Sequence, residues 1–121
     1  MDRKVSVAPM MDCTDRHERF FLRLISKNVL LYTEMIVSEA INRGDKKKLL
    51  EFNIEEKPVA LQVGGSSPKL LAEAAKVGEE FGYDEINLNL GCPSKKVQKN
   101  KFGACLIKEP SLVADCLNEM R

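Results

Sequence analysis

The chain has 121 residues, which is enough for one small domain with its own hydrophobic core. Hydrophobic residues make up 44% of the chain and charged residues 31%, so the composition excludes a chain that is disordered throughout. The net charge of +1 argues neither for nor against a nucleic-acid partner. The sequence has no run of about 18 or more apolar residues, so no transmembrane helix is predicted. The apolar run before Pro9 is too short for the core of a secretory signal.

Cysteine usage bears on metal binding and on the redox compartment. The four cysteines are Cys13, Cys92, Cys105 and Cys116. No two of them have C-x-x-C spacing, and the chain has a single histidine, so no metal site is expected. In a cytoplasmic protein, which is the location we expect, such thiols stay reduced.

The chain begins with a predicted strand and a predicted helix. Residues 5–8 form a short apolar run that ends at Pro9 and predicts the first strand. Thr14 or Asp15 can cap the helix that follows. Its apolar residues recur at helical spacing, which predicts an amphipathic helix. These residues are Phe20, Phe21, Leu24 and Ile25.

The next segment repeats the alternation of strand and helix. Residues 29–33 are apolar and partly β-branched and predict a second strand, with Glu34 at its tip. A short helix is predicted at residues 38–42, where Gly44 ends it. Another helical stretch is predicted at residues 46–52.

The second half of the chain continues this pattern. Residues 59–63 predict a third strand. The helix after it has Pro68 in its first turn, where proline is favoured, and ends at Gly82. Residues 85–90 predict a fourth strand. After a long loop, residues 110–120 predict the last helix.

The spacing of the four predicted strands indicates the fold class. They start roughly 25 to 30 residues apart with helices between them, which is typical of repeated parallel β–α units. Two closures fit: an open doubly wound sheet, or a (β/α)8 TIM barrel of which this chain holds the first half. In both, functional groups gather at the carboxyl ends of the strands. The sequence has neither G-x-G-x-x-G nor a G-x-x-x-x-G-K phosphate loop, which favours the α/β half-barrel of about four β–α units over the open sheet without excluding the open sheet.

The strand at residues 85–90 carries the strongest chemical pattern. Its even-numbered residues are apolar, whereas its odd-numbered residues are one glutamate and two asparagines, so one face of the strand is polar. Gly91 allows a tight turn, Cys92 stands at the strand tip and Pro93 stiffens the exit. A thiol beside two amides and before a lysine-rich loop indicates a reaction centre for an anionic substrate.

Five segments, in order along the chain, match the pattern of one enzyme family. They are Val7-Ala8-Pro9-Met10-Met11-Asp12 with Thr14-Asp15-Arg16-His17, Leu31-Tyr32-Thr33-Glu34-Met35, Pro58-Val59-Ala60-Leu61-Gln62, Asn87-Leu88-Asn89-Leu90-Gly91-Cys92-Pro93-Ser94, and Phe102-Gly103-Ala104-Cys105-Leu106. Together they closely resemble the tRNA-dihydrouridine synthases. The Thr-Asp-Arg-His and Phe-Gly-Ala-Cys-Leu runs resemble the DusA subfamily in particular.

The resemblance implies a TIM barrel with flavin mononucleotide (FMN) over the carboxyl ends of its strands, followed by a helical tRNA-binding domain. Enzymes of this family reduce the C5–C6 double bond of uridines in the tRNA D-loop, after NADPH has reduced the flavin. The residue that matches Cys92 is the acid: the reduced flavin gives a hydride to C6 and the thiol protonates C5. An ordinary cysteine thiol is mostly protonated near neutral pH, which suits this role. The alternative is that Cys92 is a small buried hydrophobic residue.

The resemblance also implies the residues that hold the flavin and the uridine. Gln62 matches the glutamine that hydrogen-bonds the flavin ring. Pro9, Met10 and Met11 match the segment that lines this ring, although ordinary core packing is the alternative for the methionines. Asn89 matches a position that contacts the target uridine, since an amide can both donate and accept at the uracil edge. The alternative for Asn89 is a structural amide that bonds the loop.

A lysine cluster follows Cys92 directly. The cluster consists of Lys95, Lys96 and Lys99, and Lys101 follows two residues later. A solvated loop is the ordinary interpretation of such a cluster, but beside a strand-tip cysteine it predicts attraction to the phosphates of tRNA. Contacts of this kind set the affinity and its salt dependence, not the choice of uridine.

The chain departs from the family pattern at two points. Cys13 stands where the subfamily usually has tryptophan. In addition, residues 1–121 match only the N-terminal portion of the flavin-binding domain, without the C-terminal half-barrel, the later flavin ligands and the helical tRNA-binding domain. We therefore expect that these residues alone are not a competent enzyme.

Two other interpretations of the sequence stay open. One is a truncated, non-catalytic remnant or a tRNA-interaction module. The other is a different flavin barrel, such as a dihydropyrimidine or dihydroorotate dehydrogenase. We rank this second one lower because those enzymes lack the combined motifs. The oligomeric state is not predicted.

Overall fold

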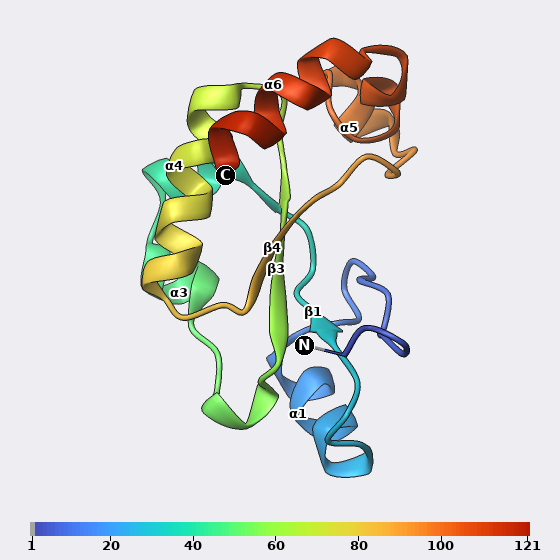
Figure 1. The fold of residues 1–121 in the computed structure, drawn as a ribbon, viewed down its shortest axis with the longest axis vertical. Helices are drawn as coiled ribbons and strands as arrows, with labels where there is room; N and C mark the ends of the chain where they lie inside the picture. The colour runs from blue at the N-terminus through green and yellow to red at the C-terminus, as the bar shows by residue number, and fades with distance from the viewer. Residues whose placement is uncertain (1) are drawn as a thin grey trace.

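The computed structural model, which describes residues 2–121, has an α/β fold built on a parallel sheet (Figure 1). Strand β3 (Val59–Gly64) lies in the middle and pairs in parallel with β4 (Glu85–Leu88) on one edge. On its other edge β3 pairs with β1 (Leu31–Tyr32) and then with β2 (Ile36–Val37). The prediction of an α/β fold with parallel strands is confirmed.

The second predicted strand is shorter than predicted, and the same edge of the sheet resumes beyond Glu34 as a separate strand, β2. Leu31 pairs with Val59 but Ile36 pairs with Val63, so this edge carries one extra residue and bulges between β1 and β2. The cause is Thr33, whose hydroxyl oxygen accepts the Gln62 N–H at 3.0 Å. A side chain thus takes the place of one backbone acceptor in the ladder. The predicted end of this strand before Glu34 agrees with β1, but the resumption of the edge at β2 was not predicted.

Residues 5–8 form a single bridge where a strand was predicted. Ser6 pairs with Leu30 in parallel, the Val7 N–H donates to the Leu30 carbonyl at 3.0 Å, and the Leu30 N–H donates to the Val5 carbonyl at 3.2 Å. This segment pairs on one side only within the described residues, and Val5 is 61% exposed. Pairing with one neighbour over so short a stretch does not make a regular strand.

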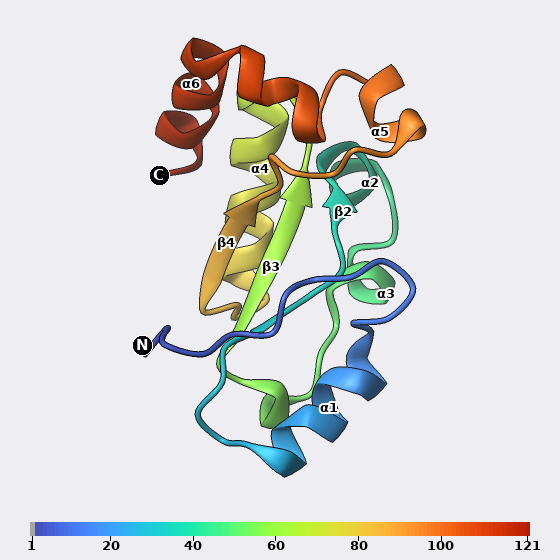
Figure 2. The ribbon, with the colours of Figure 1, turned by 90° about the vertical axis from the view of Figure 1, so that its right-hand side faces the viewer.

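Helices cover one face of the sheet and the end at which β3 and β4 finish. The face of the sheet is covered by α2 (Ser38–Arg43), α3 (Lys46–Leu50) and α4 (Pro68–Glu80). The end of the sheet is crossed by α5 (Lys95–Lys99) and α6 (Pro110–Met120) (Figures 1 and 2). The buried side of α4 packs on the apolar side of β3 and β4. This core includes Val59, Leu61, Val63, Leu71, Ala74 and Val77.

Local signals fix the ends of α4. Ser67 caps α4 by accepting the Leu70 N–H, Pro68 stands in its first turn, and Gly82, with φ +89°, follows its end. The structure differs from prediction after Cys92, where the predicted long loop forms α5 and a 3₁₀ helix, η2 (Gly103–Lys108). The lysine cluster therefore lies mainly on a short helix.

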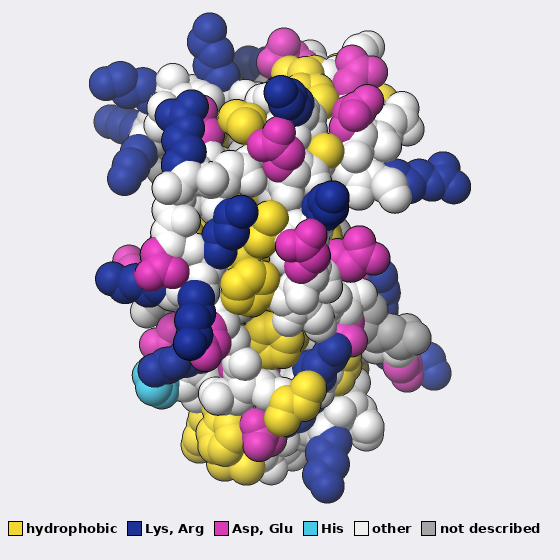
Figure 3. All heavy atoms as spheres, turned by 90° about the vertical axis from the view of Figure 1, so that its left-hand side faces the viewer, with side chains coloured by type: hydrophobic (Ala, Val, Ile, Leu, Met, Phe, Trp, Pro, Cys, Tyr) yellow, Lys and Arg dark blue, Asp and Glu magenta, His cyan; other side chains and the backbone are white. Residues whose placement is uncertain are grey.

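Helix α1 (Arg16–Ile25) forms where it was predicted, but its apolar residues face outward. Phe21, Leu24 and Ile25 are 61%, 72% and 69% exposed, and Figure 3 shows hydrophobic side chains at the lower end of the molecule, where α1 lies. The buried residues of α1 are two arginines, Arg19 and Arg23. Their partners lie around the 3₁₀ helix η1 (Ile54–Glu56), which the amphipathic pattern could not reveal.

No helix within residues 2–121 combines the length and the apolar character that crossing a membrane requires.

Candidate functional site

The polar face of β4 meets the amide of Gln62 on β3. Gln62 Nε2 donates to Asn87 Oδ1 at 2.8 Å, and Asn89 Nδ2 donates to Gln62 Oε1 at 3.0 Å. On the other face of β4, Ile86 and Leu88 pack on the hydrophobic core. The predicted division into an apolar and a polar face is confirmed over β4, which ends at Leu88, two residues before the predicted end, so that Asn89 lies just beyond the strand. The sequence analysis gave Asn87 no role, although its position on the polar face was a signal for one.

The turn that presents Cys92 is folded by Asn89 rather than by Gly91. Asn89 Oδ1 accepts the Gly91 N–H at 3.2 Å and the Cys92 N–H at 3.0 Å. Gly91 has no left-handed backbone angle, and a Cβ added to it would meet nothing within 4 Å. Gly91 was expected to allow a tight turn, but nothing in its conformation requires glycine: an asparagine side chain supplies the acceptor that the turn requires.

A cleft of about 930 Å³ opens at the carboxyl ends of the strands, which is within the range of small-molecule sites. Residues from four separate segments line it. Of the residues that the sequence analysis singled out, the cleft brings together Pro9, Met10, Met11, Gln62, Asn89, Cys92 and Lys96. Cys92 is half-buried in this position.

The methionine side of the cleft is held by a buried hydroxyl. Thr14, which is 3% exposed, accepts the Met10 N–H at 3.1 Å and donates to the Met10 carbonyl at 3.2 Å. Thr14 does not cap α1: Asp15 does, by accepting the N–H groups of His17 and Glu18. The hydrogen bond from the Glu18 N–H lowers the pKa of the Asp15 carboxyl. Thr14 therefore fixes the methionine loop, and its neighbour Asp15 fixes the start of α1.

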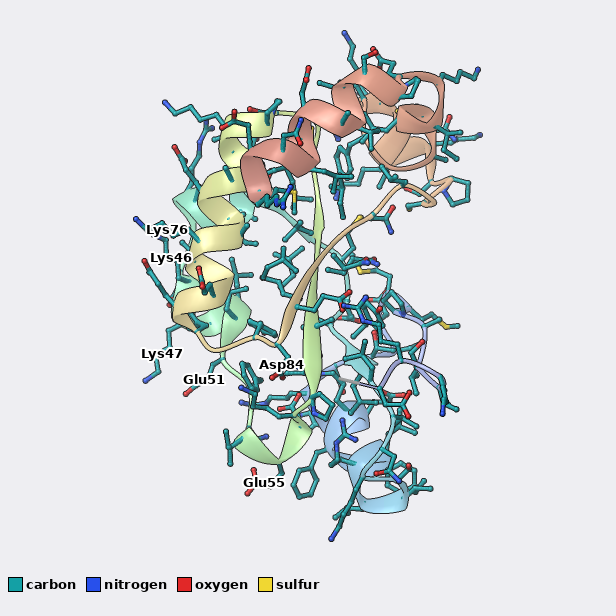
Figure 4. All side chains as sticks on the ribbon, in the orientation of Figure 1. Lys46, Lys47, Glu51, Glu55, Lys76 and Asp84 are labelled. Carbon is teal, nitrogen blue, oxygen red and sulfur yellow. The ribbon has the colours of Figure 1, made fainter. Side chains whose placement is uncertain are left out.

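The predicted lysines are only partly at the cleft. Lys96 lines it, whereas Lys95 and Lys99 are exposed on α5 and are not among its lining residues. On the opposite side of the molecule, lysines and acids are interspersed over α3 and α4 (Figure 3). Figure 4 labels Lys46 and Glu51 there, and both side chains point outward. A run of lysines in the sequence therefore does not by itself identify a residue of the cleft, and only Lys96 of the three predicted lysines lines it.

The remaining cysteines differ in their surroundings. Cys116 is fully buried under α4, and burial raises the pKa of its thiol. Cys105 donates to the Phe102 carbonyl at 3.0 Å and Cys13 is exposed. Of the four cysteines, only Cys92 lines the cleft. Within residues 2–121, no three or more His, Cys, Asp or Glu side chains gather in a way that could hold a metal ion.

Fold and cleft together define an α/β protein with a ligand site at the carboxyl ends of parallel strands. The family model described as "Dihydrouridine synthase (Dus)" matches residues 6–121, so the chain belongs to the dihydrouridine synthase family.

Curated relatives over the same region are closely similar. The chain is 61% identical over 117 residues to the tRNA-dihydrouridine(20/20a) synthase of Synechocystis sp., a match that covers 97% of this chain and 35% of that protein. It is 56% identical over 120 residues to the enzyme of the same name from Pseudomonas aeruginosa, covering 99% of this chain and 36% of that protein. The chain thus spans about a third of the length of these relatives.

Proposed function

We propose that residues 1–121 form the N-terminal portion of the catalytic domain of a cytoplasmic tRNA-dihydrouridine(20/20a) synthase. On this proposal they make the first half of a TIM barrel, with the C-terminal half-barrel and a helical tRNA-binding domain lying outside them. The observation that carries the proposal is the convergence of Cys92, Gln62, Asn89 and Lys96 on one cleft with the methionine loop. Membership of the family supports it.

The residues around the cleft fit a flavin ring. Pro9, Met10 and Met11 offer an apolar wall, and Gln62 offers an amide edge whose orientation is fixed by Asn87 and Asn89. Gln62 Nε2 uses one of its two hydrogens for Asn87, so the other remains available for a ring oxygen or nitrogen. When bound and reduced by NADPH, FMN supplies the hydride that uracil C6 accepts.

Cys92 is the proton donor in this proposal. It holds a proton at Sγ and delivers it to uracil C5, which completes the reduction of the C5–C6 bond. Its backbone is fixed on both sides: the N–H donates to Asn89 Oδ1, and the carbonyl accepts the Ala104 N–H at 3.0 Å. A thiol on a backbone held in this way can stay aligned with a bound base.

The uridine and the tRNA backbone have separate contacts. Asn89 uses its oxygen in the turn and one amide hydrogen for Gln62, which leaves the second hydrogen for a uracil carbonyl. Lys96 lies on the cleft wall, where it can attract a phosphate near the target base. Lys95 and Lys99 stand farther out and add attraction along the tRNA.

The full-length protein that carries residues 1–121 tests the proposal directly. With FMN, NADPH and unmodified tRNA we expect dihydrouridine to form, as detected by mass spectrometry of tRNA digests. Cys92→Ala should lower this rate about 10²- to 10⁴-fold, the usual contribution of general acid catalysis. The matched control Cys105→Ala removes a thiol outside the cleft and should stay near the parent rate.

Two results would contradict the proposal. One is a flavin-loaded protein that forms no dihydrouridine. The other is a Cys92→Ala variant that forms it at the parent rate. Retention of tRNA without any flavin would favour the alternative of a tRNA-interaction module.

A further inference from the structure

A second segment of the chain reaches back to the reactive turn. The Ala104 N–H donates to the Cys92 carbonyl at 3.0 Å, so the start of η2 is bonded to the backbone of the cleft cysteine. Beneath this bond, Val97, Phe102 and Leu106 form a small buried cluster against which Cys92 packs. Val97 and Phe102 also line the cleft, so this segment supports Cys92 within the cleft wall.

Gly103 makes this close approach possible. Its φ is +69°, and a Cβ built on it would lie 2.7 Å from the Cys92 carbonyl oxygen and 3.3 Å from Cys92 Cβ. It would also lie 2.5 Å from Val97 Cγ1. The Val97 side chain could be trimmed, but the Cys92 carbonyl is backbone, so a side chain at position 103 requires the backbone of residue 103 and that of Cys92 to move apart.

The chain contains a matched glycine for comparison. Gly82 also has a left-handed φ, +89°, but a Cβ added there would meet nothing within 4 Å. Alanine at either position is strained because of its φ. Only at position 103 does it also press on Cys92. The two positions therefore separate backbone strain from displacement of the thiol.

We propose that Gly103 is a positioning residue for the reaction: its lack of a side chain sets where the Cys92 thiol stands over the bound uracil. This inference rests on the proton-donor role proposed for Cys92 and adds a residue that does not itself touch the substrate. Displacements of the order of 1 Å at a reacting group can slow a reaction about 100-fold. The effect of Gly103 should fall on the step that needs the thiol and on no other.

The test separates the two half-reactions in the full-length protein. Flavin reduction by NADPH is followed under anaerobic conditions, and the reduced protein is then mixed with tRNA to measure dihydrouridine formation. For Gly103→Ala we expect flavin reduction and tRNA affinity within about twofold of the parent, and dihydrouridine formation about 100-fold slower. For Gly82→Ala we expect both half-reactions near the parent rates.

A double-mutant cycle with Cys92→Ala identifies the route of the effect. If Gly103 acts through the thiol, Gly103→Ala causes no further loss of dihydrouridine formation in the Cys92→Ala background. An equal loss in both backgrounds would overturn the inference. So would a Gly82→Ala variant as slow as Gly103→Ala.

A third variant keeps the test decisive if Gly103→Ala folds poorly. Val97→Ala combined with Gly103→Ala removes the side-chain clash and leaves the contact with the Cys92 carbonyl, so dihydrouridine formation should stay slow. Recovery of the parent rate in this double variant would show that Gly103 only relieves packing. The proposed function itself fails if Cys92→Ala is active, whereas the inference alone fails if Cys92→Ala is inactive and Gly103→Ala is active.

Discussion

The two ends of the sheet bury polar side chains for different purposes. At the amino end, Arg19 Nε and Glu56 Oε1 lie 2.6 Å apart, with side chains 6% and 0% exposed. At the carboxyl end, Gln62 is hydrogen-bonded to Asn87 and to Asn89, but Gln62 and Asn89, which line the open cleft, each keep an unused amide hydrogen. Burial of a polar group is therefore not a sign of function by itself; spare hydrogen-bonding capacity at a cavity is.

At the amino end, hydrogen bonds commit both arginines and Glu56 to the fold. Glu56 Oε2 accepts the Asn53 N–H, and Arg19 Nη1 donates to the Thr14 carbonyl. Arg23 Nη2 donates to the Glu56 and Pro58 carbonyls, and burial lowers the pKa of Arg23. These bonds turn the arginine side of α1 inward, and the apolar residues of α1 face outward as a consequence.

The largest expected effect comes from breaking the amino-end ion pair. Glu56→Ala leaves Arg19 buried without its carboxylate, and loss of one partner of a buried pair typically costs about 3–5 kcal/mol. The free energy of unfolding, measured by urea denaturation of the full-length protein, should fall by about this amount. The neighbouring Glu55, labelled in Figure 4, is exposed, so Glu55→Ala should change it by no more than about 0.5 kcal/mol. Equal effects of the two variants would contradict a structural role specific to this pair.

A smaller effect is expected when the carboxyl-end amide is removed. Gln62→Ala takes away one hydrogen bond to the proposed flavin, which corresponds to about a three- to tenfold weaker FMN affinity. The control Gln98→Ala removes an exposed glutamine that bonds the Pro93 carbonyl, and should leave FMN affinity unchanged. Fluorescence titration with FMN measures both. Unchanged FMN affinity in Gln62→Ala would confine Gln62 to a structural role.

The cap of α1 gives an effect that depends on pH. Asp15→Ala should lower the free energy of unfolding by about 1 kcal/mol at neutral pH, whereas Asp15→Asn keeps an acceptor and should lose less. The pKa of Asp15 is lowered in the folded protein, so its contribution is present above the pKa of the unfolded chain and is lost as the pH falls through the folded pKa. Urea denaturation at several pH values should therefore show the difference between Asp15→Ala and the parent shrinking in acid. If the difference in free energy of unfolding stayed constant with pH, the charge of Asp15 would not contribute to the cap.

The smallest expected effect concerns the lysines. Lys96→Ala at the cleft should reduce the magnitude of the slope of log affinity for tRNA against log salt concentration by about 1, the contribution of one phosphate contact. It should not change which uridine is reduced. Lys46→Ala, on the opposite side of the molecule, should leave the slope unchanged (Figure 4). Filter binding over a range of salt concentrations measures both. Equal slopes for the two variants would show that Lys96 does not contact the tRNA phosphates.

Elements governed by local signals could be predicted from the sequence. The helix over Pro110–Met120 and the helix that Ser67 caps have the predicted bounds or nearly so, because caps, prolines and apolar spacing all lie within the segment. Features that depend on distant partners could not be predicted. The outward apolar face of α1 follows from Glu56, which lies 37 residues from Arg19 in sequence.

The site divides in the same way. Parity along β4 predicted that Asn87 and Asn89 share a face, but not that Gln62 bonds both of them. The motif around Gly103 was recognised as part of a family pattern, yet its contact with Cys92 depends on a backbone turn that only the folded chain forms. The residue types were thus accessible from the sequence, and their mutual support was not.

In the proposed reaction, Cys92 supplies a proton to a uracil held at the carboxyl end of the sheet. The most direct measurement reduces the bound flavin with NADPH without oxygen, adds tRNA, and follows flavin reoxidation and dihydrouridine together in the full-length protein. The parent should reoxidise its flavin as dihydrouridine appears, while Cys92→Ala should keep its flavin reduced and form product about 10² to 10⁴ times more slowly. Equal rates in the two proteins would contradict the proposed reaction.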